Sequence, residues 1–353
     1  MAFLKIENVA IRGVSACVPS KVEENKDLIF YGPGEAEQVM AATGIERRHV
    51  ATDGITASDL CYKAAEELLS MLGWERESVD LLAFVTQCPD YVTLPNSFIV
   101  HHKLSMREDC ICLDFYHGCP GWVVALSSVT SMMSTGTIKR AILLVGDTCS
   151  QIQYANNREE KPLIGDAGSV TALEFDHCAS AMLFDMGTQS DDAEMLVKPY
   201  GGFRSPYTQE TLKYVLDLRS GKSSDFSDAG QMDGMGVFSF AISKPPKSIK
   251  KLCSEYRISL ENIDNLFLHQ GNKIILENIA KRLKMPMEKV PSSLRNYGNT
   301  TSVSIPLTIV TERDTQLSSS RQKNIACAFG TGMAWGTVYF ETQNIVVPQL
   351  IVL

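Results

Sequence analysis

An internal repeat places the strongest constraint on the fold of this chain. Residues 77–82 (Glu-Ser-Val-Asp-Leu-Leu) resemble residues 261–266 (Glu-Asn-Ile-Asp-Asn-Leu), and residues 140–146 resemble residues 324–330. Both pairs are separated by the same distance along the sequence, because 264 − 80 and 330 − 146 each equal 184. Two separate matches at one offset indicate that the chain arose by duplication.

The two halves also share an order of predicted elements. After a first strand at 3–12, apolar or small side chains recur at helical spacing over 58–72, and an apolar strand follows at 81–86. The offset places this helix on a lysine-rich helical stretch at 242–256. Helices that alternate with strands in this way predict parallel sheets covered by helices.

We therefore predict an α/β protein built from two pseudo-symmetric halves, residues 1–178 and residues 179–353. Equivalent loops of the two halves should meet near the pseudo-two-fold axis. Loops at the carboxyl ends of parallel strands are where such folds bind ligands. The functional residues are therefore expected at strand ends.

One cysteine stands where a strand meets a helix. Residues 110–115 are predicted to form a buried strand and residues 122–132 a helix, with Cys119 between them and Pro120 at the helix start. Free backbone N–H groups and the helix dipole would favour the thiolate of Cys119, the form that attacks carbonyl carbons. The alternative is that Cys119 is a small buried hydrophobic residue.

Two polar residues occupy related positions in the second half. The offset places Cys119 on Val303, directly after a Gly-Asn-Thr-Thr-Ser segment that contains Asn299. His269 follows the apolar residues 266–268 and precedes a predicted helix at 274–283. Each residue alone could be an ordinary polar or turn residue. Their occurrence with Cys119 at related loops predicts a shared catalytic site.

Composition excludes several functional classes. The net charge of −8 and the lack of a basic stripe with interleaved aromatic residues argue against a nucleic-acid partner. Apolar runs are far shorter than the roughly 20 residues of a membrane span, and no signal peptide is evident, so we expect a cytoplasmic protein without membrane association. The ten cysteines lack metal-site spacing, and His177 with Cys178 is an isolated pair, so no metal is expected.

Several segments carry a family resemblance that covers essentially the whole chain. They are residues 43–48 (Thr-Gly-Ile-Glu-Arg-Arg), 86–91 with Leu94 and Pro95, the glycine-rich turn 165–169, the closing glycine loop 329–336, and Cys119, His269 and Asn299 in that order. Together they resemble the thiolase-like condensing enzymes, and within them β-ketoacyl-acyl-carrier-protein synthase III. The resemblance implies a thiolase-like fold with helix, sheet, helix, sheet and helix layers, and a homodimer.

The resemblance also implies a reaction and its residues. Cys119 would accept an acyl group from a coenzyme A or carrier-protein thioester, and malonyl-acyl carrier protein would then condense with it after decarboxylation. His269 and Asn299 would stabilise the enolate, and the backbone N–H groups of Cys119 and Gly332 would form the oxyanion hole. Leu94, Asn272 and Lys273 would contact the substrate. No metal or other cofactor is implied.

Departures from the family pattern leave alternatives open. Ile274 stands where the family usually has a carrier-docking arginine, although Lys273 and Lys284 could supply a basic patch. The acyl group could instead pass to a hydroxyl or amine acceptor. A 3-hydroxy-3-methylglutaryl-type synthase needs a pocket glutamate, and the 86–95 loop offers only Asp90.

Two further functions and one segment stay open at this point. A cysteine-histidine hydrolase would use His269 as the base for Cys119. A non-catalytic partner subunit would generally lack the nucleophile. Residues 207–236 form a long polar insertion, which is either a lid over the site or a surface excursion.

Overall fold

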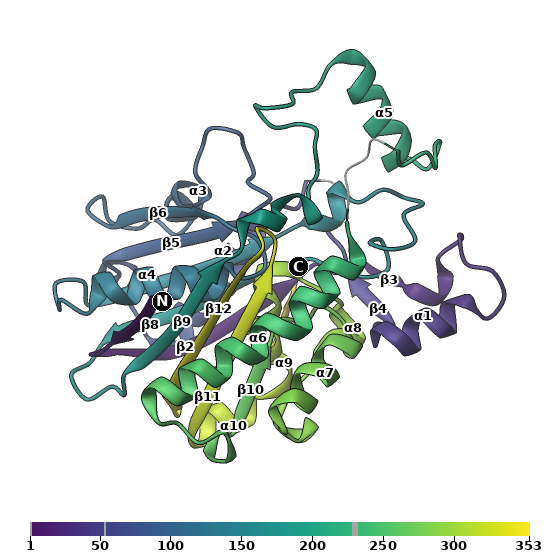
Figure 1. Ribbon diagram of the computed structural model, residues 1–353. Helices are drawn as coiled ribbons and strands as arrows, with labels where there is room; N and C mark the ends of the chain where they lie inside the picture. Colours follow the sequence, from purple (N-terminus) through teal and green to yellow (C-terminus); the bar gives the residue numbers. More distant parts are fainter. Residues whose placement is uncertain (1, 53, 228–231) are drawn as a thin grey trace.

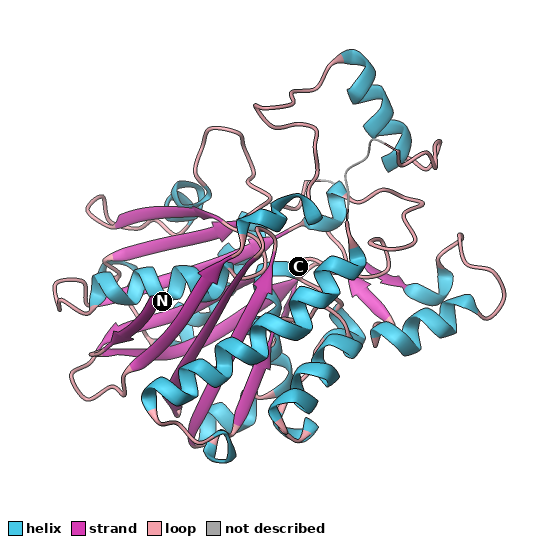
Figure 2. Ribbon diagram, in the orientation of Figure 1, coloured by secondary structure: helices cyan, strands magenta, loops and turns pink. Residues whose placement is uncertain are grey.

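The computed structural model describes residues 2–52, 54–227 and 232–353, and two central sheets dominate them (Figure 1). One sheet has the strand order β1-β9-β12-β11-β10, and the other has the order β13-β2-β8-β7-β5-β6. Strands β3 and β4 form a separate small ribbon. Figure 2 shows the strands of both sheets enclosed by helices.

The bounds of the elements are as follows. The strands are β1 Ala2–Ile6, β2 Val9–Val18, β3 Val22–Glu24, β4 Arg47–His49, β5 Leu81–Thr86, β6 Ile111–Tyr116, β7 Arg140–Asp147, β8 Ala167–Phe175, β9 Met182–Thr188, β10 Asn265–Leu268, β11 Arg321–Gly330, β12 Ala334–Gln343 and β13 Ile351–Val352. The helices are α1 Glu35–Thr43, α2 Ala57–Leu72, α3 Asn96–Lys103, α4 Gly121–Met133, α5 Gln209–Arg219, α6 Gly234–Tyr256, α7 Lys273–Leu283, α8 Leu294–Tyr297, α9 Ser304–Glu312 and α10 Asp314–Ser319.

The layers follow from where each helix buries its apolar residues. Helices α4 and α9 contact strands of both sheets and share one apolar core with them, so they form the middle layer. Helix α2 packs on β2, β7 and β8, and helix α6 packs on β9, β11 and β12 from the opposite side. The predicted α/β architecture of five alternating layers is confirmed. Among the described helices, none combines the length and apolar character that a membrane span requires.

The repeat appears as equivalent elements in the two halves. Strand β5 begins at Leu81 and strand β10 at Asn265, which are again 184 residues apart. Both strands pair in parallel with the strand that follows the middle helix of their half, β7 or β11. The terminal strands cross between the halves, because β1 joins the sheet of β9–β12 and β13 joins the sheet of β2. The division at residue 178 stays a prediction.

The single strand predicted at 3–12 is wrong. The structure has two strands, β1 and β2, which belong to different sheets. Between them Asn8 adopts a left-handed backbone conformation with φ 66°, which asparagine tolerates better than most residues. The apolar pattern continues across this break and therefore hides it.

The strand predicted at 110–115 exists as β6, but it is not buried. Among the described strands it pairs only with β5, and it forms the edge of its sheet. Its exposed side chains include Ile111 and Tyr116, and Tyr116 is 80% exposed. The predicted burial is therefore wrong. Alternating apolar residues indicate a strand, but they do not show whether a neighbouring element covers it.

The glycine-rich segment 165–169 differs from expectation, whereas for the insertion at 207–236 the choice between a lid and a surface excursion stays open. Residues 165–169 do not form a turn, because β8 begins at Ala167 and Gly168 packs directly on the backbone of α2. The insertion at 207–236 contains α5, which projects from the layers in Figure 1 and buries Val215 and Leu218. Residues 228–231 of this insertion lie outside the described residues.

Candidate active site

Cys119 lies between the end of β6 and the start of α4, as predicted. It is 9% exposed and Pro120 occupies the N-cap position. Close packing requires glycine around it: a Cβ on Gly121 would lie 2.6 Å from Val85 Cγ1, and one on Gly330 would lie 2.9 Å from Cys119 Sγ. The second half therefore holds Cys119 in place through the end of β11.

The protonation state of Cys119 differs from the sequence-based prediction. Burial, with a smaller contribution from the Asp147 carboxylate, raises the pKa of Cys119 to about 12. Backbone N–H groups of Cys119 and Thr331 lower the pKa but do not compensate. The predicted thiolate is wrong for the resting protein, because loss of solvation outweighs these N–H groups. Cys119 could therefore act as a nucleophile only after its thiol loses a proton.

His269 directly follows β10 and is 4% exposed. Its Nδ1 lies 2.9 Å from Ser304 Oγ, and its ring meets the Phe329 ring edge-on with 5.4 Å between centroids. Burial lowers the pKa of His269 to about 4, so the imidazole is neutral at neutral pH. The Ser304 hydroxyl can donate to or accept from Nδ1, so Nε2 can present either a hydrogen or a lone pair.

Asn299 lies in the turn between α8 and α9. Its backbone N–H donates to the Leu163 carbonyl at 2.8 Å, and its carbonyl accepts from the Gly165 N–H at 3.1 Å. Its Oδ1 accepts from the Thr301 N–H at 2.9 Å. The acceptor end of the amide is therefore held by its own turn, which leaves Nδ2 as the donor end.

A buried aspartate joins the two halves beside these residues. Asp147 Oδ1, at the end of β7, accepts from Thr86 Oγ1 at 3.1 Å and from the Gln87 N–H at 2.9 Å. Its Oδ2 accepts from Thr301 Oγ1 and Ser302 Oγ, each at 2.5 Å. Asp147 thus fixes the turn that carries Asn299 relative to the first half.

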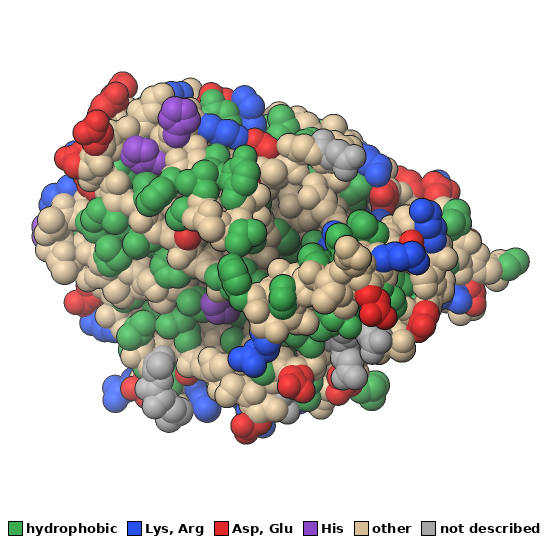
Figure 3. Space-filling view, turned by 90° about the horizontal axis from the view of Figure 1, so that it is seen from above, with side chains coloured by type: hydrophobic (Ala, Val, Ile, Leu, Met, Phe, Trp, Pro, Cys, Tyr) green, Lys and Arg blue, Asp and Glu red, His purple; other side chains and the backbone are tan. Residues whose placement is uncertain are grey.

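A cavity of about 480 Å³ unites the three predicted catalytic residues. Cys119, His269 and Asn299 line it together with apolar side chains, and a hollow among hydrophobic side chains is visible on the face shown in Figure 3. The apolar lining residues are Ile152, Leu163, Ile164, Leu196, Val197, Met232, Val237, Phe238, Phe240, Ala241, Ile275, Phe329 and Met333. Such a lining suits an acyl chain.

The remaining predicted site residues are less closely grouped. Asn272 lines the cavity and caps α7, since its Oδ1 accepts from the Ile275 N–H at 2.9 Å. Gly332 lies in the turn between β11 and β12 with φ 129°, and it is not among the lining residues. Lys273 is exposed at the start of α7, and Leu94 is 44% exposed and also outside the lining.

Three residues at the site were not predicted from the sequence, and Gly330 was predicted only as part of the closing glycine loop. Asp147 ends an apolar strand, and a buried acid at a strand end was the available signal for it. Glu160 and Lys198 form an ion pair of 2.5 Å in the cavity wall. No pattern in the sequence links these two residues, because they lie in irregular segments 38 positions apart.

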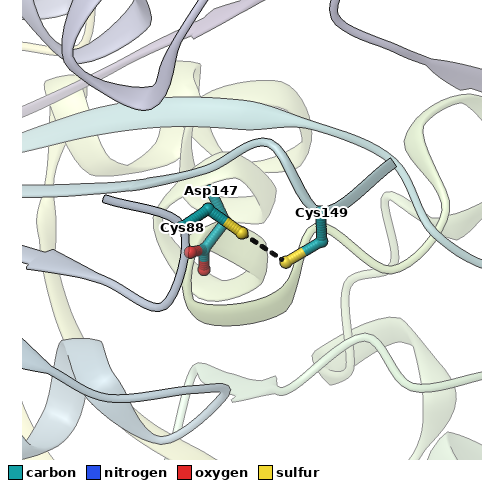
Figure 4. A group of neighbouring side chains, drawn as sticks. All are labelled: Cys88, Asp147 and Cys149. Atoms are coloured by element: carbon teal, nitrogen blue, oxygen red, sulfur yellow. Dashed lines mark hydrogen bonds between the residues drawn. The ribbon is translucent and has the colours of Figure 1, made fainter. Parts of the chain in front are cut away.

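One group of side chains has the composition of a metal site. Ligand atoms of Cys88, Asp147 and Cys149 lie within 4.8 Å of one another (Figure 4). Both oxygens of Asp147 already accept hydrogen bonds from hydroxyl and backbone donors. The carboxylate oxygens are therefore already occupied by hydrogen bonds within the fold. Two cysteines alone are fewer than the four ligands of a structural zinc site.

Comparison with known proteins agrees with this geometry. Residues 113–191 match the family model described as 3-Oxoacyl-[acyl-carrier-protein (ACP)] synthase III, and residues 253–342 match its C-terminal model. A solved 3-oxoacyl-(acyl-carrier protein) synthase from Burkholderia xenovorans is 32% identical, with a TM-score of 0.91 over 100% of this chain and 99% of that chain.

Curated relatives span the chain at lower identity. The β-ketoacyl-[acyl-carrier-protein] synthase III of Prochlorococcus marinus is 29% identical over 94% of this chain and 96% of its own length. The protein of the same name from Streptococcus equi subsp. equi is 28% identical over 96% and 99%. With Cys119, His269 and Asn299 in one cavity, these similarities lead to one conclusion: the chain belongs to the 3-oxoacyl-[acyl-carrier-protein] synthase III family of condensing enzymes.

Proposed function

We propose that this chain condenses an acyl thioester with a malonyl thioester, with loss of carbon dioxide, to give a β-ketoacyl thioester. One observation carries the proposal: a single cavity is lined by the Cys119 thiol from the first half and by His269 and Asn299 from the second. A nucleophile for acyl transfer and donors for an enolate are the two requirements of this reaction. The names of the relatives support the same chemistry.

In the first step, the Cys119 sulfur attacks the acyl carbonyl and the carrier leaves as a thiol. His269 relays the proton from Cys119 to the leaving sulfur, because its neutral imidazole can offer a lone pair at Nε2. The backbone N–H groups of Cys119 and Gly332 stabilise the oxyanion in this proposal. Gly332 lies between Thr331 and Met333, which both line the cavity.

In the second step, a malonyl thioester enters and loses carbon dioxide. The negative charge of the resulting enolate gathers on its oxygen, where Nε2–H of His269 and Nδ2 of Asn299 donate hydrogen bonds. The carbanion then attacks the acyl carbon, so that a carbon–carbon bond forms and the bond to the Cys119 sulfur breaks. No metal or nucleotide cofactor takes part.

The substrates reach the site as coenzyme A or acyl-carrier-protein thioesters, with malonyl-acyl carrier protein as the second substrate. Asn272 lines the cavity and Lys273 is exposed beside it, at the start of α7. Lys281 and Lys284 are exposed farther along this helix and at its end. These cations support docking of an acidic carrier or of coenzyme A phosphates.

The working form is a homodimer in this proposal. Within the described part of the chain, no strand pairs with the outer side of the edge strand β6, which exposes Ile111 and Tyr116. The preceding loop and α3 expose Leu94 and Phe98, and the nearby Asn96 N–H donates to Asp114 of β6. An apolar sheet edge of this kind favours pairing with a second copy. Leu94 would then contact substrate from within the dimer.

The cysteines support a cytoplasmic location. All ten are free thiols, and seven of them are buried. Reduced thiols of this kind accord with a reducing compartment. Fractionation of expressing cells tests this part of the proposal. Recovery of the protein in a periplasmic or membrane fraction would contradict it.

The decisive experiment follows carbon dioxide release. Acylated enzyme is mixed with a malonyl thioester labelled at the free carboxyl group, and labelled carbon dioxide and β-ketoacyl product are expected in equal amounts. The main alternative is transfer of the acyl group to a hydroxyl or amine. If acyl-Cys119 formed and passed its acyl group to such an acceptor without carbon dioxide release, the condensation proposal would be overturned.

A further inference from the structure

Two thiols that take no part in the condensation lie against each other beside the cavity. Cys88 Sγ and Cys149 Sγ are 3.2 Å apart, and Figure 4 shows the two sulfurs facing each other. Cys88 follows β5 and Cys149 follows β7, which are neighbouring parallel strands. The spacing is closer than ordinary packing of two sulfurs requires, and about 1.2 Å of movement would reach a covalent S–S distance.

Hydrogen bonds on both sides hold the pair in this arrangement. The Cys88 N–H donates to Thr86 Oγ1 at 2.8 Å, and Gln87 Nε2 donates to Cys149 Sγ at 3.2 Å. Asp147 fixes both Thr86 and Gln87 at the base of the Cys88 loop. The sulfurs are thus positioned by the ends of two neighbouring strands.

The two thiols differ in access. Cys88 is half-buried and lines a second cavity of about 500 Å³, whereas Cys149 is 4% exposed and lines the cavity of Cys119. The contact with Cys88 and burial together raise the pKa of Cys149 well above its ordinary value, so Cys149 stays a thiol at neutral pH. A small oxidant therefore meets Cys88 first, and Cys149 is placed to react second.

We propose that Cys88 and Cys149 form a redox modification site, which a hydroperoxide converts into a reversible disulfide. The Cys88 sulfur attacks one peroxide oxygen, giving a sulfenic acid and one molecule of water. The Cys149 sulfur then attacks the Cys88 sulfur and displaces a second water, which takes up the Cys149 proton. Two thiols are oxidised and one hydrogen peroxide is reduced, and a dithiol reductant reverses the reaction.

The disulfide would form part of the wall of the cavity that Cys119 lines. Cys149 lines that cavity, and Gln87 lines it as well while donating to the Cys149 sulfur. Cys119 is not a member of the pair, so the modification does not consume the nucleophile. The proposal is independent of the condensation reaction, and either can fail without the other.

The test uses the position of trypsin cleavage sites. Peptides 77–103 and 141–158 each contain one cysteine, Cys88 and Cys149, whereas Cys110, Cys112 and Cys119 share peptide 108–139. Full-length protein carrying Cys119→Ser is treated with hydrogen peroxide, alkylated and digested without reduction. We expect peptides 77–103 and 141–158 to appear as one disulfide-linked species, which dithiothreitol separates.

Matched variants make the result decisive. Cys88→Ser should abolish the linked species while leaving thermal unfolding unchanged, and Cys178→Ser, at an exposed cysteine, should leave the link intact. The proposal is overturned if both peptides are recovered alkylated and separate after Cys178 has been oxidised. It is also overturned if either peptide links to the Cys178 peptide as readily as to its proposed partner, because this would indicate random exchange.

Discussion

The two halves differ most at the segment that precedes the middle helix. In the first half this segment is strand β6, which leads to Cys119 at the start of α4. At the equivalent offset of 184, the second half has the short helix α8 and the turn of Asn299 before α9. One duplicated scaffold therefore supplies the tightly packed Cys119 on one side and the side-chain amide of Asn299 on the other. It also leaves the first half with an additional edge strand.

This comparison predicts that the two turns serve different steps. Asn299→Ala should lower carbon dioxide release from a malonyl thioester about 100- to 1,000-fold, because one enolate donor is lost. Acylation of Cys119 should change by less than about threefold, since no interaction of Asn299 in that step is proposed. Both rates can be measured on one preparation, by label release and by intact mass. Equal losses in the two steps would contradict the division of labour.

The buried imidazole makes a second difference between the halves, because the position equivalent to His269 is Val85. The pKa of His269 is lowered from 6.5 to about 4, so the unfolded chain binds a proton in this window and the folded chain does not. The free energy of unfolding should therefore fall by about 3 kcal/mol as the pH drops from 6.5 to 4. His269→Gln should remove this share of the pH dependence in denaturant titrations. If the free energy of unfolding of the variant kept the same dependence on pH, another group would be responsible for it.

Equivalent glycines near the ends of β7 and β11, Gly146 and Gly330, provide a matched pair of variants. A methyl group on Gly330 would meet Cys119 Sγ at 2.9 Å, whereas one on Gly146 would meet Cys61 Sγ at 2.6 Å on α2. Each alanine substitution should cost about 1–3 kcal/mol of stability through overpacking. Only Gly330→Ala should also slow the acylation of Cys119, measured at a temperature where both variants are folded. Equal slowing in both would indicate a general loss of structure.

The extra edge strand predicts a smaller and separate effect. Ile111→Lys should weaken association of two copies about tenfold, equivalent to about 1.4 kcal/mol, because a charge opposes pairing of the β6 edges. Analytical ultracentrifugation would measure this change. Ile29→Lys is the control, since Ile29 is 93% exposed and lies outside β6. If both variants behaved like the unmodified protein, the dimer interface would lie elsewhere.

Much of this arrangement could be predicted because it follows from local patterns repeated at one offset. Helix α2, strand β5 and the positions of Cys119, His269 and Asn299 at strand or helix ends were all correct. Long-range partners were not predictable. The hydrogen bonds of Asp147 and the contact of Gly330 with Cys119 depend on how the two halves pack together. Such packing produces no repeating pattern of residues from which it could be predicted.

Burial was predicted less well than secondary structure, for a physical reason. The pattern of β6 indicated a strand, but no strand of the described residues pairs with its outer side. The helix start at Cys119 suggested a thiolate, but the cost of burying a charge depends on surrounding atoms from both halves. Both errors arise where a property is set by packing and not by local sequence.

An acyl-enzyme on Cys119 can be detected by intact-protein mass after incubation with a panel of acyl-coenzyme A and acyl-carrier thioesters. We expect a mass gain of one acyl group in the natural chain and none in Cys119→Ser. Peptide mapping should place the acyl group on Cys119, and the best donor would define the substrate class. If the protein gained no mass with any donor while the thioesters stayed intact, the acyl-enzyme mechanism would be contradicted.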